Sequence, residues 1–144
     1  MVDSRQPVKG NGMPPGAFVR VLFPTHEKPR HPGLLHIGYV LGSTTTEAMV
    51  AYTTSQPWPV ATPMPAGARF FDAEEAKSLN QSKPFILRLD VLAKLPVTEA
   101  WFPDIEQAGQ GVIAVAPARL QEHLTDLAMS LVRRRRALIE MRGL

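Results

Sequence analysis

Hydrophobic and polar residues alternate along several short segments of the chain, most clearly between residues 85 and 91. There the apolar residues at the four odd positions alternate with Ile86, Arg88 and Asp90. A period of two is typical of a half-buried β-strand, so we expect the odd positions to face the interior. The other face then carries Arg88 and Asp90, roughly 6.6–6.8 Å apart along the strand. Such a pair is either a surface salt bridge or a cation and a carboxylate that straddle a phosphate and a hydroxyl.

Other apolar segments of strand length are separated by polar loops and by turns rich in glycine and proline. Gly42-Ser43-Thr44 and the pair Gly109 and Gly111 indicate turns. The segment at residues 112–115 is apolar enough for an inner strand. In all, we expect further strands at residues 17–23, 34–41, 47–54, 97–102 and 112–115.

Two segments have the features of helices. Asp72, followed three residues later by Glu75, resembles a capping box and predicts one short helix through Leu79. After Pro117 the apolar residues recur near helical spacing, and they form one stripe of leucines at positions 120, 124, 127, 131 and 138. The second helix is therefore expected to run from Pro117 to about Met141.

The order of these elements predicts the fold class and the domain organisation. Several short strands followed by a terminal helix favour a mainly β fold, a small twisted barrel closed against the C-terminal helix. Residues 1–15 are rich in glycine, proline and polar residues and predict a disordered arm, so the single domain would span residues 16–144. Residues 56–70 contain four prolines and predict a long loop without sheet pairing.

Composition narrows the class of protein. The chain has 144 residues, of which 44% are hydrophobic, as is typical of one globular domain. It contains no cysteine, which excludes disulfides and thiolate metal sites. No apolar run approaches the ~20 residues of a membrane-spanning helix, and the N-terminus lacks the order of a signal peptide. We therefore expect a soluble cytoplasmic protein with no membrane partner.

The positive charge of the chain is concentrated near its end. The net charge is +3, and the run Arg133–Arg136 alone exceeds it. This run is either a nucleic-acid patch or a solvated helix end, where positive charge complements the helix dipole. Four consecutive helical residues point in different directions, so they do not form one flat face.

Sequence signals for a metal or a cofactor are missing. His26, His31, His36 and His123 do not have the spacing of a helical metal-binding pair. The chain also has no glycine-rich phosphate-binding motif and no Gly-x-Ser-x-Gly motif. We therefore expect neither a metal nor a cofactor.

Two polar segments remain as candidates for chemistry. The loop at residues 26–31 contains two histidines and three other charged residues. It is either a solvated hairpin loop or a substrate-facing loop that offers proton transfer near neutral pH. Thr53, Thr54 and Ser55 are either an ordinary strand end or three hydroxyls that bind phosphate oxygens.

Four segments follow one another in an order that a known family shares. Residues 16–27, GAFVRVLFPTHE, combine a Gly-led strand, a Pro-Thr step and a His-Glu loop. Arg30 and Pro32 then precede two leucines, residues 50–55 form a strand ending in hydroxyl residues, and Arg88-Leu89-Asp90 follows. In this order they resemble the PemK/MazF-type toxins over roughly residues 16–95. His31, the long proline-rich loop, the Trp-Phe-Pro segment at 101–103 and the arginine run depart from that pattern.

The resemblance implies a compact SH3-like β-barrel with helices, usually a homodimer. It implies a metal-independent endoribonuclease that cleaves single-stranded RNA and is neutralised by an antitoxin protein whose tail lies in the RNA groove. By position, Asp90 would be the general base, with Arg88 and His26 at the scissile phosphate. Arg30 and the three hydroxyl residues at 53–55 would help to bind RNA.

These roles are chemically consistent with one another. A base that removes the proton of an RNA 2′-OH lets that oxygen attack phosphorus and expel the 5′-oxygen. Asp90 beside a cation is expected to stay ionised and to serve as that base. A guanidinium barely releases a proton, so we assign Arg88 to stabilising charge on the phosphorane oxygens. An imidazole is the better acid for the leaving oxygen, and we assign that role to His26.

Two other functions are compatible with the same pattern. A non-catalytic SH3-like binding module would keep the barrel and use the charge pair as a surface salt bridge. A phage or mobile-element accessory protein would instead dock a partner on the leucine stripe of the terminal helix.

Overall fold

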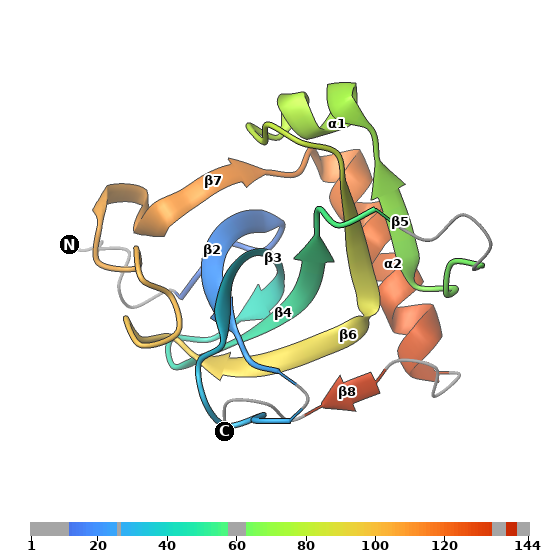
Figure 1. The fold of residues 1–144 in the computed structure, drawn as a ribbon. Helices are drawn as coiled ribbons and strands as arrows, with labels where there is room; N and C mark the ends of the chain where they lie inside the picture. The colour runs from blue at the N-terminus through green and yellow to red at the C-terminus, as the bar shows by residue number, and fades with distance from the viewer. Residues whose placement is uncertain (1–11, 26, 58–62, 134–137, 141–144) are drawn as a thin grey trace.

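The computed structural model describes residues 12–25, 27–57, 63–133 and 138–140 (Figure 1). Among these residues two α-helices and a 3-10 helix accompany the strands: α1 (Ala73–Ser78), α2 (Ala118–Arg133) and η2 (Ala108–Gly111). Within the described residues seven strands form one sheet: β2 (Ala17–Phe23), β3 (Leu34–Ser43), β4 (Glu47–Thr54), β5 (Ala68–Phe71), β6 (Phe85–Pro96), β7 (Val112–Val115) and β8 (Leu138–Glu140).

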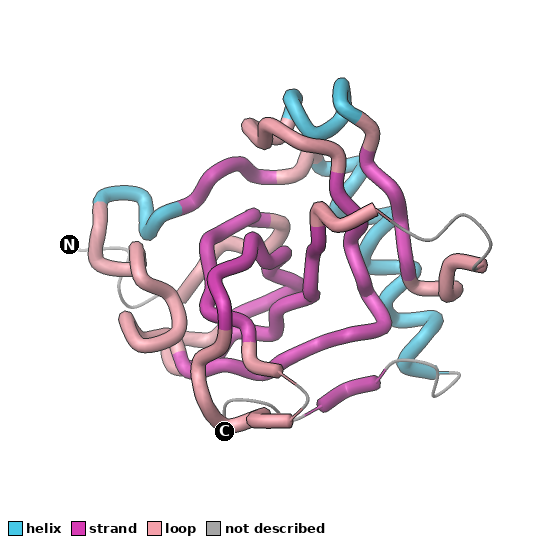
Figure 2. The backbone as a smooth tube through the Cα atoms, viewed as in Figure 1, coloured by secondary structure: helices cyan, strands magenta, loops and turns pink. Residues whose placement is uncertain are grey.

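Six of the strands are antiparallel neighbours in the order β5-β6-β4-β3-β2-β7, and β8 pairs in parallel with β6. The sheet curls into a half-barrel, and α2 lies beside β6 (Figures 1 and 2). The predicted mainly β class with a C-terminal helix is therefore confirmed. Among the described strands the antiparallel path ends at β5 and β7, so within this part of the chain β7 lies at an edge of the sheet and not at the predicted inner position.

Strand β6 bends sharply in the middle, and its pairing shows why. Tyr52 of β4 pairs with Arg88, but the preceding Ala51 pairs with Leu92, so three residues of β6 bulge out of the ladder with β4. At the bulge the Leu89 N–H donates instead to the Gly67 carbonyl at 2.9 Å. A bulge of this kind bends a strand and changes which face its side chains occupy.

The bulge explains how β6 contributes to two hydrophobic clusters on opposite faces of the sheet. The helix-side core includes Phe18, Tyr39, Phe71, Phe85, Leu87, Leu89, Leu92, Leu124 and Leu131. The loop-side core includes Met13, Val19, Val21, Val40, Val50, Ala93, Leu95, Trp101 and Phe102. The odd positions Phe85, Leu87 and Leu89 are buried together as predicted, whereas Val91, beyond the bend, packs against the loop-side core.

The predicted helices form, although one is shorter than expected. Asp72 and Glu75 make the predicted capping box, with Glu75 N–H donating to the Asp72 carboxylate at 2.9 Å and Asp72 N–H donating to Glu75 at 3.2 Å. Helix α2 ends at Arg133 rather than near Met141, and Leu138 lies in β8. The rest of the leucine stripe packs on the helix-side core of its own chain, so it does not form a free docking surface. Of the arginine run, residues 134–136 lie outside the described residues.

Four other predicted boundaries are wrong. Residues 97–102 form turns, because β6 continues to Pro96 and the chain then folds back to bury Trp101 and Phe102. Ala68–Phe71 pairs with β6 although it lies mostly within the predicted loop. Gly42 and Ser43 belong to β3, and the turn follows them. Gly12 and Met13 are buried, so the folded body begins before residue 16.

Candidate functional site

The two charged residues predicted on one face of β6 bind each other. Arg88 Nε donates to one Asp90 carboxylate oxygen at 2.9 Å, and its Nη2 donates to the other at 2.7 Å. The Arg88 side chain is 20% exposed and that of Asp90 is 12% exposed. This planar, two-bond geometry is the strongest form of ion pair, and its partial burial limits screening by salt. The predicted pair is therefore fixed at the bend of β6 rather than solvated at random.

The hydrogen bond from Arg88 to Asp90 also affects the acidity of the guanidinium. That bond raises the pKa of Arg88, the charge of Asp90 adds to the effect, and partial burial opposes it. A guanidinium held in this way is a poorer proton donor than a free one. The geometry therefore favours charge stabilisation over acid catalysis by Arg88.

Two aromatic rings lie on the same face of the sheet as Arg88. Residues paired across antiparallel strands share a face, and successive residues alternate between faces. Tyr52 pairs with Arg88, and Gly38 pairs with Tyr52, so His36, two residues before Gly38, also lies on this face. The rings of His36 and Tyr52 are 4.8 Å apart. We call this side of the sheet, which bears His36, Tyr52 and Arg88, the Arg88 face.

An apolar cavity adjoins the Arg88 face at the start of β6. Phe70 of β5 pairs with Ile86, two residues before Arg88, and Phe70 is 50% exposed. Phe70 and Ile86, with Pro57, Met64 and Pro84, line a cavity of about 640 Å³. An exposed aromatic ring offers a surface on which a base or another flat group can stack. Phe70 was not predicted as a site residue, because residue 70 lies in the predicted proline-rich loop.

The three predicted hydroxyl residues are divided between the two faces. Thr53 pairs with Leu87, lies on the helix-side face and donates a hydrogen bond to the Ile37 carbonyl. Thr54 pairs with Ile86 and therefore lies on the Arg88 face. Ser55 lines both the apolar cavity and a second cavity on the helix side. Only Thr54 thus shares a face with the charge pair, while the Thr53 hydroxyl has a structural role.

The remaining predicted residues lie in the loop between β2 and β3. His26 lies outside the described residues. Arg30 is exposed and, with Lys28, His31 and other loop residues, borders a shallow cavity of about 620 Å³. Neither the ion pair nor the apolar cavity includes Arg30 among its residues. The structure therefore does not place Arg30 at the charge pair.

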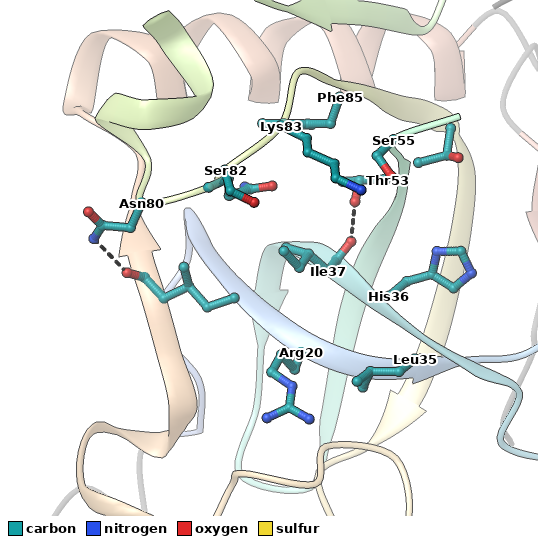
Figure 3. Close-up of a pocket in the computed structure, with 13 residues that line it drawn as sticks. Arg20, Leu35, His36, Ile37, Thr53, Ser55, Asn80, Ser82, Lys83 and Phe85 are labelled. Atoms are coloured by element: carbon teal, nitrogen blue, oxygen red, sulfur yellow. Dashed lines mark hydrogen bonds between the residues drawn. The ribbon is translucent and has the colours of Figure 1, made fainter. Parts of the chain in front are cut away.

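A second, polar pocket lies between the strand ends and the segment that joins α1 to β6 (Figure 3). Its volume is about 520 Å³, and its walls include Arg20, Asn80, Gln81 and Lys83. Phe85 and Ile113, which belong to or pack on the helix-side core, also line it. The pocket therefore opens mainly on the face opposite Arg88. Sequence patterns gave no signal for it, since its polar residues come from four separate segments.

The described residues contain no group of three or more His, Asp and Glu side chains arranged to hold a metal ion. No described helix is long and apolar enough to cross a membrane. Comparison of the chain with models of known protein families and with curated proteins finds no match. The resemblance to the PemK/MazF-type toxins therefore stays a prediction that depends on the residues quoted above.

Proposed function

We propose that the protein is a toxin-type endoribonuclease that cleaves single-stranded RNA without a metal, using Asp90 and Arg88. One observation carries the proposal. The bidentate, partly exposed Arg88–Asp90 pair shares a sheet face with Tyr52 and with the half-exposed ring of Phe70, which lies two residues along β5 from the partner of Arg88. An unpaired nucleotide is bound by a cation at its phosphate and by an aromatic ring on which its base stacks. Arg88 and Phe70 supply these two groups from neighbouring strands.

The reaction begins at the 2′-OH of the nucleotide whose phosphate lies at Arg88. One Asp90 oxygen takes the 2′-OH proton, and the freed oxygen bonds to the adjacent phosphorus. The bond from phosphorus to the 5′-oxygen then breaks, which leaves a 2′,3′-cyclic phosphate and a 5′-OH. Arg88 turns one of its N–H groups from Asp90 to the phosphorane oxygens, where charge accumulates. The same movement frees a carboxylate oxygen to act as the base.

The leaving 5′-oxygen needs a proton, and an imidazole suits that role near neutral pH. His26, three positions after Phe23 in the sequence, remains the first candidate. His36 is the second candidate, because its ring lies on the Arg88 face against Tyr52. Arg30, Thr54 and Ser55 are proposed to bind the RNA chain on either side of the cleaved bond, and Thr53 is withdrawn because its hydroxyl bonds to Ile37.

RNA cleavage by the purified chain in EDTA tests this proposal. We expect the wild type to cleave a long single-stranded RNA, and D90N and R88Q each to lose at least about 100-fold in rate, as expected for removing a base or a charge stabiliser. The matched control is the Glu47–Lys94 pair, whose atoms are 3.2 Å apart and which joins β4 to β6 away from Arg88. E47Q and K94Q should cleave like the wild type. Equal rates for D90N and wild type would refute the site.

The non-catalytic binding module remains the second candidate, because both Asp90 oxygens are already occupied by Arg88. A carboxylate held in this way is a weak base unless the substrate opens the pair. RNA binding by the wild type without cleavage in the same assay would select the module.

We also propose that the protein acts in the cytoplasm as a homodimer and that an antitoxin protein covers the Arg88 face. Bacterial growth tests the last point. Expression of the wild type should arrest growth and expression of D90N should not. Growth arrest by both would remove RNA cleavage at Asp90 as the cause.

A further inference from the structure

The polar pocket on the helix side has the charge of an anion site. Its cationic lining residues are Arg20 and Lys83, and no Asp or Glu is among the described residues that line it. Figure 3 shows Lys83 extended over Thr53 across the pocket. Arg20 instead donates to Asp104, 3.2 Å away and outside the pocket lining, so its charge is partly offset. Lys83 is therefore the main source of positive charge inside the pocket.

One residue that lines the pocket, Gln81, has an unused hydrogen-bond donor. Gln81 Nε2 is buried and has no hydrogen-bond partner among the described residues. A buried amide without a partner costs free energy, so such a group commonly marks a place where a ligand or water bonds. The neighbouring Asn80 holds this segment in place: it adopts a φ of 59° and donates its side-chain amide to the Ile113 carbonyl at 2.9 Å.

The floor of the pocket is apolar. Phe85, Ile37 and Ile113 line it, and the volume of about 520 Å³ lies within the range of small-molecule sites. A flat, apolar group therefore fits against the floor, while a phosphate reaches Lys83 and an edge of the flat group reaches Gln81. A nucleotide combines these three features.

We infer that the polar pocket binds one nucleotide, with its base on the Phe85 floor, a base edge at Gln81 and its phosphate at Lys83. The site is separate from the charge pair, because Phe85 and Leu87 face the helix side and Arg88 faces the other side. Ser55, Lys83 and Phe85 line both this pocket and the cavity that includes Phe70, so the two cavities adjoin and an RNA chain that passes the end of β4 contacts both. The identification of this nucleotide as part of an RNA substrate rests on the proposed function. The binding of a nucleotide in the pocket does not depend on that function.

Isothermal titration calorimetry of the full chain with the four nucleoside 5′-monophosphates and with inorganic phosphate tests the inference. We expect at least one monophosphate to bind at one site, and more tightly than inorganic phosphate. K83Q should weaken that binding about tenfold, the ordinary effect of losing one charge-assisted hydrogen bond. Q81M should reduce the difference in affinity between bases. The matched control is K77Q, at an exposed lysine of α1 outside the pocket.

The outcomes separate this inference from the proposed function. Binding that is weakened about tenfold in K83Q but unchanged in K77Q, R88Q and D90N supports the pocket, even if the wild type never cleaves RNA. No binding of any monophosphate, equal binding of inorganic phosphate, or equal affinities of K83Q and K77Q overturns it. RNA cleavage by a protein that fails these binding tests would leave the proposed function standing alone. Circular dichroism of K83Q and Q81M establishes that both variants are folded.

Discussion

Asp90 accepts two hydrogen bonds from Arg88, at 2.9 and 2.7 Å, directly at the bulge that bends β6 between its two halves. Arg88 is the last residue that pairs with β4 before the bulge, and Asp90 lies inside the unpaired segment. The ion pair thus joins these two parts of β6. A planar two-bond contact across a bulge restricts the bend to one geometry. The same contact that would orient a base and a cation for chemistry also stabilises the shape of the half-barrel.

We predict that the Arg88–Asp90 pair contributes to stability as well as to cleavage. R88M leaves a carboxylate that is only 12% exposed without its donors, and D90N replaces a charged acceptor by a neutral one. Each change should lower the free energy of unfolding by about 1–3 kcal/mol, measured by urea denaturation. The Glu47–Lys94 pair, with both side chains about one-third exposed, should couple by less than about 1 kcal/mol. Equal coupling energies for the two pairs in double-mutant cycles would contradict this.

Gly67 should be intolerant of any side chain, because it packs against the backbone of Asp90. A Cβ at Gly67 would lie 2.8 Å from Asp90 N and 2.8 Å from a Leu131 methyl. The backbone of β6 does not move aside cheaply, so G67A should cost about 1–3 kcal/mol and shift Asp90 away from Arg88. Gly42 has nothing within 4 Å of its Cβ position, and G42A is the matched control. Thermal unfolding of both, with RNA cleavage, should show losses in G67A alone.

Local sequence patterns predicted the local elements of this fold. Ala17–Phe23, Glu47–Thr54 and the capped helix α1 form at the expected residues, since alternation and capping depend on neighbours in the chain. The bulge in β6 did not follow from the pattern, because an extra residue in a ladder depends on the partner strand. The alternating run at residues 85–91 therefore predicted the face of Arg88 correctly but placed Val91 on the wrong face.

The candidate site was predicted in part for the same reason. Arg88 and Asp90 are two residues apart, so their contact follows from strand geometry. Tyr52 and Phe70 come to the same face as Arg88 only through pairing of β4 and β5 with β6, which the sequence alone does not specify. Thr53 was assigned to RNA binding by the resemblance to the toxin family, but its hydroxyl donates to the Ile37 carbonyl.

Asp72, the N-cap residue of α1, should contribute measurably to the stability of the protein through the capping box. The Asp72 carboxylate accepts from Glu75 N–H, and replacing it with alanine leaves that N–H without its cap. D72A should lower the free energy of unfolding by about 0.5–2 kcal/mol, whereas D72S keeps an acceptor and should cost less. Guanidinium denaturation of the three proteins checks this. A D72S variant less stable than D72A would contradict it.

Alkaline pH should destabilise the protein through Tyr39. Burial raises the pKa of Tyr39 to about 12, from an ordinary value of 10.0. Between these values the unfolded chain loses the phenol proton while the folded chain keeps it. The contribution of Tyr39 to the free energy of unfolding is therefore complete below pH 10. It falls by up to roughly 3 kcal/mol as the pH rises toward 12. Denaturant titrations at pH 9 and above should give a shallower decline for Y39F than for the wild type, and parallel curves would contradict the assignment.

Phe70 should matter for RNA affinity and little for folding. Its ring is half exposed and lies two residues along β5 from the partner of Arg88, so its truncation removes a stacking platform without opening a core. F70A should weaken binding of a short single-stranded RNA by about 1–3 kcal/mol, or roughly 5- to 150-fold, measured by fluorescence anisotropy on a D90N background that prevents cleavage. Met129 on α2, 46% exposed, provides the matched control M129A. An equal loss of affinity in F70A and M129A, or a loss in F70A that is explained by unfolding, would show that Phe70 does not bind RNA.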